Sequence, residues 1–230
     1  MDIFRKRLTL VLTCLLAASC GINRSIVVAD GESLEGGRST VNGSVRIGSE
    51  CTVNGNCRTV NGRVTVGQGS SVGGLTTVNG SISIADEVSA AGNVRTVNGS
   101  MVLGSGISVE GGLETVNGSV ECGPGTVAND VSTVNGSISL EGTRVGGGLT
   151  TTNGSVKLTG GARVAGDVIV KGKDRPGARK KTIEILIADG SVVEGDIVVR
   201  DPGRQVRVYL INGGTVEGEV KNADIIDREE

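Results

Sequence analysis

The sequence predicts an all-β protein folded as a single-stranded parallel β-helix, a triangular solenoid with about 18–19 residues in each coil. Two observations predict this fold. The string Thr-Val-Asn-Gly, once Thr-Thr-Asn-Gly, recurs every 18 or 19 residues, and apolar residues recur at fixed offsets between its copies. A fixed period of this length is typical of a solenoid, because each repeat forms one coil. Apart from an extra copy at Thr52, which falls at offset 12 of another repeat, the copies begin at Thr40, Thr59, Thr77, Thr96, Thr115, Thr133 and Thr151.

The apolar positions inside each repeat form three pairs. Counted from the threonine, they fall at offsets 5 and 7, 11 and 13, and about 17 and 1, and one residue separates the members of the first two pairs. This alternation predicts three short strands per coil and therefore a triangular cross-section. In this register Val97 is expected in the core between Val78 and Val116, whereas threonines such as Thr40 and Thr96 are expected to point outward.

Asn-Gly at offsets 2 and 3 marks a corner of each coil. Both residue types tolerate the left-handed backbone conformation that tight turns use. We therefore expect pairs such as Asn98-Gly99 to adopt that conformation.

The composition limits both the core and the chemistry. Glycine makes up 39 of 230 residues, and the chain has one Phe, one Tyr, no Trp and no His. Without large aromatic side chains the core must be thin and aliphatic. Without histidine, mechanisms that use imidazole as a base or a metal ligand are excluded. A formal net charge of −2 gives no overall basic surface for nucleic acid.

Residues 1–19 are predicted to be a signal peptide. Basic residues at positions 5–7 precede an apolar run at 8–18 that is too short to span a bilayer. The following Ala-Ala-Ser-Cys20 resembles the lipobox of bacterial lipoproteins. The resemblance implies that Cys20 receives a diacylglycerol and attaches the chain to a membrane of the cell envelope. Gly21, rather than Asp, follows the cysteine and favours the outer membrane; an ordinary secretory signal is the alternative.

Residues 20–200 are predicted to form the solenoid, and residues 201–230 its last coil and a polar C-terminal cap. A degenerate first coil starts straight after Cys20, because the segment 22–28 aligns with 41–47. Near residue 171 the repeat is interrupted, and a loop is expected to replace the Asn-Gly corner.

The interrupting loop, residues 171–181, is strongly basic. It is either a solvated insertion or a site that binds anionic lipid or an acidic envelope polysaccharide. Nucleic acid is not an expected partner, because aromatic side chains for base stacking are missing. The cations of the loop are Lys171, Lys173, Arg175, Arg179, Lys180 and Lys181.

Cys51, Cys57 and Cys122 fall at inward positions. Cys51 and Cys57, which belong to one coil, are either small buried hydrophobic residues or partners in a disulfide formed in an oxidising compartment. Cys122 is expected to be unpaired. With no Cys-x-x-Cys pair and no histidine, a zinc site is not expected.

No group of residues predicts catalysis. Outward acids such as Glu50, Asp86 and Glu110 are scattered singly, and a lone Tyr209 cannot line a sugar-binding groove. We therefore expect no enzyme activity, no cofactor and no metal.

The repeat resembles that of bactofilins and related polymer-forming bacterial β-helix proteins. The resemblance rests on Thr-Val-Asn-Gly-Ser-Val/Ile-x-Ile/Val/Leu-Gly followed by Val-x-Gly-Gly-Leu, and it covers about residues 21–200. It implies a right-handed triangular β-helix that can associate end to end. Bactofilins are cytoplasmic, whereas this chain carries an export signal. Because charged residues crowd the C-terminus, we expect weak self-association at most.

These features together favour a non-enzymatic cell-envelope lipoprotein that acts as a rigid scaffolding rod and contacts another envelope protein or polysaccharide. The alternative is a module that binds envelope polysaccharide or anionic lipid through the basic loop.

Overall fold

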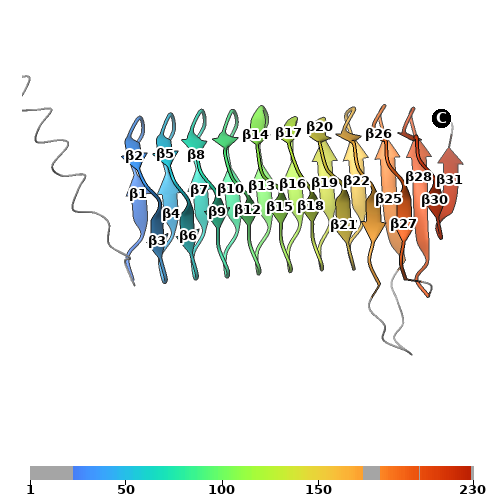
Figure 1. Cartoon of the computed structure of the whole chain (residues 1–230), viewed down its shortest axis with the longest axis horizontal. Coiled ribbons are helices and arrows are strands. Elements are labelled where there is room, and N and C mark those ends of the chain that lie inside the picture. Colours follow the sequence, from blue (N-terminus) through green and yellow to red (C-terminus); the bar gives the residue numbers. More distant parts are fainter. Residues whose placement is uncertain (1–22, 173–181, 202, 229–230) are drawn as a thin grey trace, which may run out of the picture.

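The structure, a computed structural model, describes residues 23–172, 182–201 and 203–228. Within these ranges the chain forms a straight stack of parallel strands and contains no helix (Figure 1). The strands make three sheets, and successive strands pass from the first face to the second and then to the third. This arrangement confirms the predicted parallel β-helix. Eleven strands on the first face, each about 4.8 Å from the next, give a rod roughly 50 Å long.

The first face is the longest of the three sheets. Its strands are β1 (Ile26–Val28), β4 (Val45–Ile47), β7 (Val64–Val66), β10 (Ile82–Ile84), β13 (Met101–Leu103), β16 (Val120–Cys122), β19 (Ile138–Glu141), β22 (Val156–Thr159), β25 (Ile183–Ala188), β28 (Val206–Ile211) and β31 (Asp224–Arg228).

The second face has ten shorter strands. They are β2 (Ser33–Glu35), β5 (Thr52–Asn54), β8 (Ser71–Val72), β11 (Ser89–Ala90), β14 (Ile107–Val109), β17 (Gly125–Val127), β20 (Thr143–Val145), β23 (Arg163–Val164), β26 (Val192–Val193) and β29 (Thr215–Val216).

The third face also has ten strands and completes each coil. They are β3 (Arg38–Thr40), β6 (Cys57–Thr59), β9 (Leu75–Thr76), β12 (Val94–Arg95), β15 (Leu113–Glu114), β18 (Val131–Ser132), β21 (Leu149–Thr151), β24 (Val168–Val170), β27 (Ile197–Val199) and β30 (Val220–Lys221).

The core confirms two of the three predicted pairs of inward positions. On the first face, Ile82 and Ile84 are buried on either side of the exposed Ser83. On the second face, Ile107 and Val109 are buried on either side of Ser108. Small aliphatic side chains at these positions stack coil upon coil and exclude water from the centre of the rod.

On the third face the predicted inward column at offset 17, which includes Val94, is buried, but the second inward position lies one residue earlier than predicted. Thr96 is only 3% exposed, whereas Val97, expected in the core, is 38% exposed. Thr96 can be buried because its hydroxyl donates a 2.8 Å hydrogen bond to the backbone carbonyl of Gly80 in the preceding coil. Since the inward threonine ends the third face, the valine that follows it points outward at the corner.

The Asn-Gly corners also differ from the prediction, because no residue of these pairs within the described ranges has a positive φ. The glycine is required for another reason. A Cβ atom on Gly99 would overlap the carbonyl oxygen of Gly80, which lies directly below it. Most left-handed residues in the described ranges lie instead at the corner between the first and second faces, where Glu50 has a φ of 55° and Glu87 a φ of 59°.

The asparagines of these corners form a continuous ladder. Each side-chain nitrogen donates to the side-chain oxygen of the asparagine one coil earlier, at distances of 2.7–2.9 Å. We call the edge where the third face meets the first the asparagine edge. Its members are Asn23, Asn42, Asn61, Asn79, Asn98, Asn117, Asn135 and Asn153.

Both ends of the described rod place a charged residue in line with the core. At the C-terminal end β31 pairs with β28, so that Asp227 stands opposite Leu210 at an inward position. At the N-terminal end Arg38 stands opposite the buried Cys57 and donates a 3.1 Å hydrogen bond to the carbonyl of Gly37. Inward charges on terminal strands oppose further strand pairing.

Candidate functional site: a polar groove on the first face

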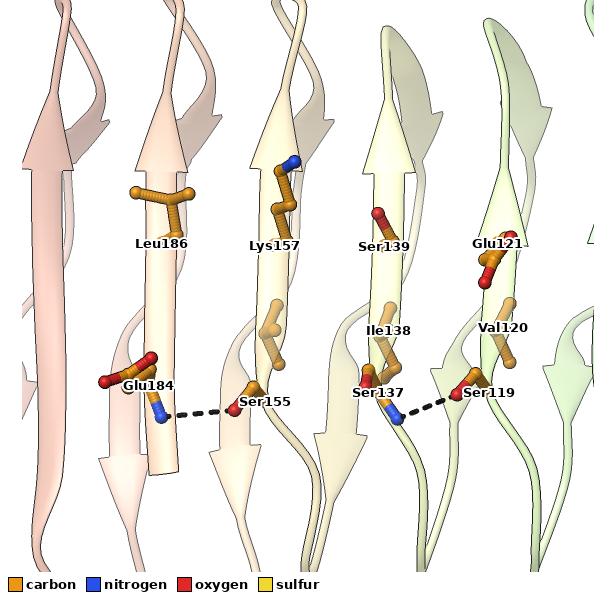
Figure 2. Close-up of a pocket in the computed structure, with 11 residues that line it drawn as sticks. Ser119, Val120, Glu121, Ser137, Ile138, Ser139, Ser155, Lys157, Glu184 and Leu186 are labelled. Carbon is orange, nitrogen blue, oxygen red and sulfur yellow. Dashed lines mark hydrogen bonds between the residues drawn. The ribbon is translucent and has the colours of Figure 1, made fainter. Parts of the chain in front are cut away.

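A groove of about 380 Å³ lies on the outer surface of the first face (Figure 2). It crosses β16, β19, β22 and β25 and opens broadly to solvent. The residues that line it are Ser119, Val120, Glu121, Ser137, Ile138, Ser139, Ser155, Val156, Lys157, Glu184 and Leu186.

The groove exists because small outward residues lie between large ones. Ser139 occupies the outward position of β19, directly between Glu121 of β16 and Lys157 of β22. Beyond Lys157, the next outward position is Leu186 of β25. Side chains of different length on neighbouring strands therefore produce a hollow without any break in the sheet.

Three serines along one side of the groove follow the corner of each coil. The hydroxyl oxygen of Ser119 accepts a hydrogen bond from the backbone nitrogen of Ser137, and that of Ser155 accepts one from Glu184, each at 3.4 Å. A serine hydroxyl that accepts in this way still has its own hydrogen to donate. The serines therefore present a row of hydrogen-bond donors to a ligand lying in the groove.

The charges around the groove are mixed. Glu121, Lys157 and Glu184 are exposed, and none forms an ion pair with another residue in the described part of the chain. The groove can thus offer two carboxylates, one ammonium group and several hydroxyls. This chemistry suits reversible binding of a polar surface, and it provides no imidazole that would activate a serine.

Most of the sequence-predicted binding residues lie outside the described ranges. These are Cys20, Lys173, Arg175, Arg179, Lys180 and Lys181. Lys171, the first cation of the basic loop, is described; it is exposed and follows β24 at the asparagine edge. Lipidation of Cys20 and anion binding by the loop accordingly remain predictions.

Cys51, Cys57 and Cys122 are buried and are free thiols in the structure. The disulfide considered for Cys51 and Cys57 is therefore not formed in it. The thiol of Cys51 donates instead to the backbone oxygen of Ala29 at 3.1 Å. Burial raises the pKa of the Cys57 thiol. A hydrogen bond with the Arg38 backbone and the positive charge of Arg38 lower this pKa, but by less than burial raises it.

A small ion cluster lies near the C-terminal end of the third face. The ammonium group of Lys221 lies 2.6 Å from Asp196 and 2.9 Å from Glu219. Hydrogen bonds to these carboxylates raise the pKa of Lys221, and the hydrogen bond from Lys221 lowers the pKa of Asp196. Among the described residues no three His, Cys, Asp or Glu side chains gather as metal ligands.

Comparisons with known proteins add no relative from which a function could be inferred. No protein-family model matches the chain, and no curated protein or solved structure is significantly similar to it. In the described part of the chain, no helix has the length and apolar character needed to cross a membrane. The resemblance to bactofilins remains a prediction from the repeat.

The groove was not predicted from the sequence. Its signal was present as a serine at offset 4 of successive repeats, Ser119, Ser137 and Ser155. That column predicts a row of small side chains, but the depth of the groove also depends on Glu121, in the coil of Ser119, and on Leu186, in the coil that follows Ser155.

Proposed function

We propose that this protein is a non-enzymatic lipoprotein of the bacterial cell envelope that acts as a rigid structural rod. The observation that carries the proposal is the continuity of the stack, in which three sheets and a side-chain ladder join the same successive coils. Each coil contacts its neighbours on all three faces, so bending at one coil would break pairing on several strands. The structural role belongs to the rod as a whole.

The membrane anchor is part of the same proposal. Cys20 carries the lipid, and only Gly21 and Ile22 lie between it and Asn23, the first described residue. Stable anchoring needs more than one acyl chain, which a diacylglycerol with an added N-acyl group supplies. The first coil would then stay close to the bilayer, with the outer membrane favoured.

The groove on the first face gives the rod a polar place for contact with another envelope protein or polysaccharide. Its openness and its mixed charges favour a transient contact over a buried one. Serine hydroxyls along β16, β19 and β22 would supply hydrogen bonds to such a partner.

Cell fractionation tests the anchor. After membranes are washed with high salt, Cys20→Ser should be found in the soluble envelope fraction and not in the membrane fraction, because the thioether attachment point is lost. Cys14→Ser, which changes the other cysteine of the predicted signal peptide, should leave the chain in the membrane fraction. Equal membrane association of both variants would overturn the proposal.

A pull-down with purified lipopolysaccharide and peptidoglycan distinguishes the alternative function. A scaffolding rod should show no salt-sensitive binding that depends on the basic loop. Binding that falls with salt and disappears when Lys171, Lys173, Lys180 and Lys181 are changed to Ser would favour the polysaccharide- or lipid-binding module instead.

A further inference from the structure

The charges of the first four coils are segregated by side. Between Asn23 and Arg95 the chain has six arginines and six carboxylates, so this part of the rod is electrically balanced. Five of the six carboxylates lie at the corner between the first and second faces, and the sixth, Glu35, ends the second-face strand β2. The six are Asp30, Glu32, Glu35, Glu50, Asp86 and Glu87.

The exposed arginines lie on the opposite side, at the asparagine edge and on the two faces that meet there. Arg24 and Arg63 lie at the edge itself, Arg46 at the outward position of β4, and Arg58 at the outward position of β6. All four are exposed, and none forms an ion pair or a side-chain hydrogen bond with a described residue. Their coils are the blue end of the rod in Figure 1.

The same edge exposes a row of apolar side chains. Val60, Val97 and Val116 are 38–39% exposed at the same position of three coils, and Val78, in the coil between the first two, is half-buried. Val27, opposite Arg46 on the first face, is 67% exposed. From Asn23 to Ser155 the corner residues of this edge include no carboxylate. An edge with cations, half-exposed valines and no acids is suited to the boundary of a negatively charged bilayer.

We propose that the asparagine edge is the membrane-facing side of the rod and docks on anionic phospholipid headgroups through Arg24, Arg46, Arg58 and Arg63. The proposal rests on the proposed anchor at Cys20. Arg24 follows Cys20 by only four residues, which span at most about 14 Å, so the lipid would hold the arginines near the surface. The second face, bordered by carboxylates, would then point away from the bilayer.

Vesicle sedimentation with the full chain carrying Cys20→Ser tests the docking without the acyl chains. The vesicles contain either phosphatidylcholine alone or one part phosphatidylglycerol to two parts phosphatidylcholine. The chain should bind only the anionic vesicles, and binding should weaken as salt screens the headgroups over a Debye length of about 8 Å. No binding to anionic vesicles at low salt would overturn the proposal.

Two double variants of equal charge identify the surface. Arg24 and Arg63→Ser, at the asparagine edge itself, should lower the partition coefficient by roughly five-fold per arginine and about 25-fold in total. The matched control changes Arg144 and Arg163 to Ser, which are exposed arginines paired side by side on the second face, and should lower it only a few-fold. Equal losses in the two variants would overturn the proposal. Circular dichroism checks that both variants keep the fold.

Two further results separate binding of single anions from docking on a lipid surface, and failure of the anchor from failure of the docking. If inorganic phosphate at low millimolar concentration displaces the chain from vesicles, the arginines bind single anions and not a lipid surface, which contradicts the proposal. Failure of the Cys20→Ser fractionation would remove the anchor but leave the vesicle result interpretable, because the vesicle assay uses the unlipidated chain.

Discussion

Arg204 donates a 2.9 Å hydrogen bond from its guanidinium to the side-chain oxygen of Asn153, the last asparagine of the ladder. The same guanidinium lies 3.3 Å from the carboxylate of Asp201, and the two side chains are only 8% and 2% exposed. Without Arg204, the final acceptor of the ladder would have no such donor. The ladder is therefore closed by a charged group from a coil further along the rod.

Arg204→Ala should reduce the free energy of unfolding by about 1–3 kcal/mol, because it removes the hydrogen bonds that the guanidinium donates to the side chains of Asn153 and Asp201. Arg200→Ala, at an exposed position on the same side, should cost within about 0.5 kcal/mol. Denaturant titration of both variants measures the difference. Similar losses would mean that the contact with Asn153 does not stabilise the rod.

Periodicity was sufficient to predict the three faces, because the aliphatic residues that fill the core, such as Ile82 and Ile84, alternate with outward polar residues. It failed at Thr96 and Val97, where hydropathy alone favours burying the valine. The decisive interaction is the hydrogen bond from Thr96 to Gly80, which joins two coils. The hydropathy of these two residues does not indicate that they are bonded. The groove was likewise beyond prediction, since its depth depends on side chains from four coils.

Thr96→Val should destabilise the rod by about 1 kcal/mol or more, because the carbonyl of Gly80 loses its hydroxyl donor. Val97→Asp should cost much less, about 0.5 kcal/mol, because that side chain points to solvent. Thermal or denaturant unfolding of the two variants compares them directly. A larger loss for Val97→Asp would restore the register first expected from the sequence.

Gly99→Ala should be among the most damaging small substitutions, at about 2 kcal/mol or more, since its new methyl group would overlap the backbone of Gly80. Gly74→Ala offers a milder comparison, because the nearest atom to its new methyl group would be the movable side-chain oxygen of Asn56. If Gly99→Ala unfolds like the parent protein, the stacked backbones are further apart than the structure indicates.

Burial raises the pKa of the Cys122 thiol to about 11 from an ordinary 9.0, outweighing a hydrogen bond with Thr143 that lowers it. The thiol of the unfolded chain ionises at a lower pH than the buried thiol, so between about pH 9 and 11 the unfolded state binds fewer protons than the folded state. The free energy of unfolding therefore falls as pH rises through this range, by at most about 1.4 kcal/mol per pH unit. Urea titrations across this range measure the slope. Cys122→Val should reduce this slope. An unchanged slope in the variant would mean that other titratable groups cause the pH dependence.

The inward charges at the two ends should keep the rod from joining end to end. Asp227→Leu together with Arg38→Leu would place apolar side chains in line with the core at both ends. This double variant should associate at concentrations where the parent protein is monomeric by light scattering. If the parent already forms long filaments, the charged ends do not block assembly.

The proposed attachment of the rod to the membrane is tested most directly by the intact mass of the chain extracted from the membrane fraction. The predicted result is a mature protein that begins at Cys20 and carries a diacylglycerol with an added N-acyl group. A mature chain that begins elsewhere, or begins at Cys20 with no added mass, would contradict the proposed lipoprotein.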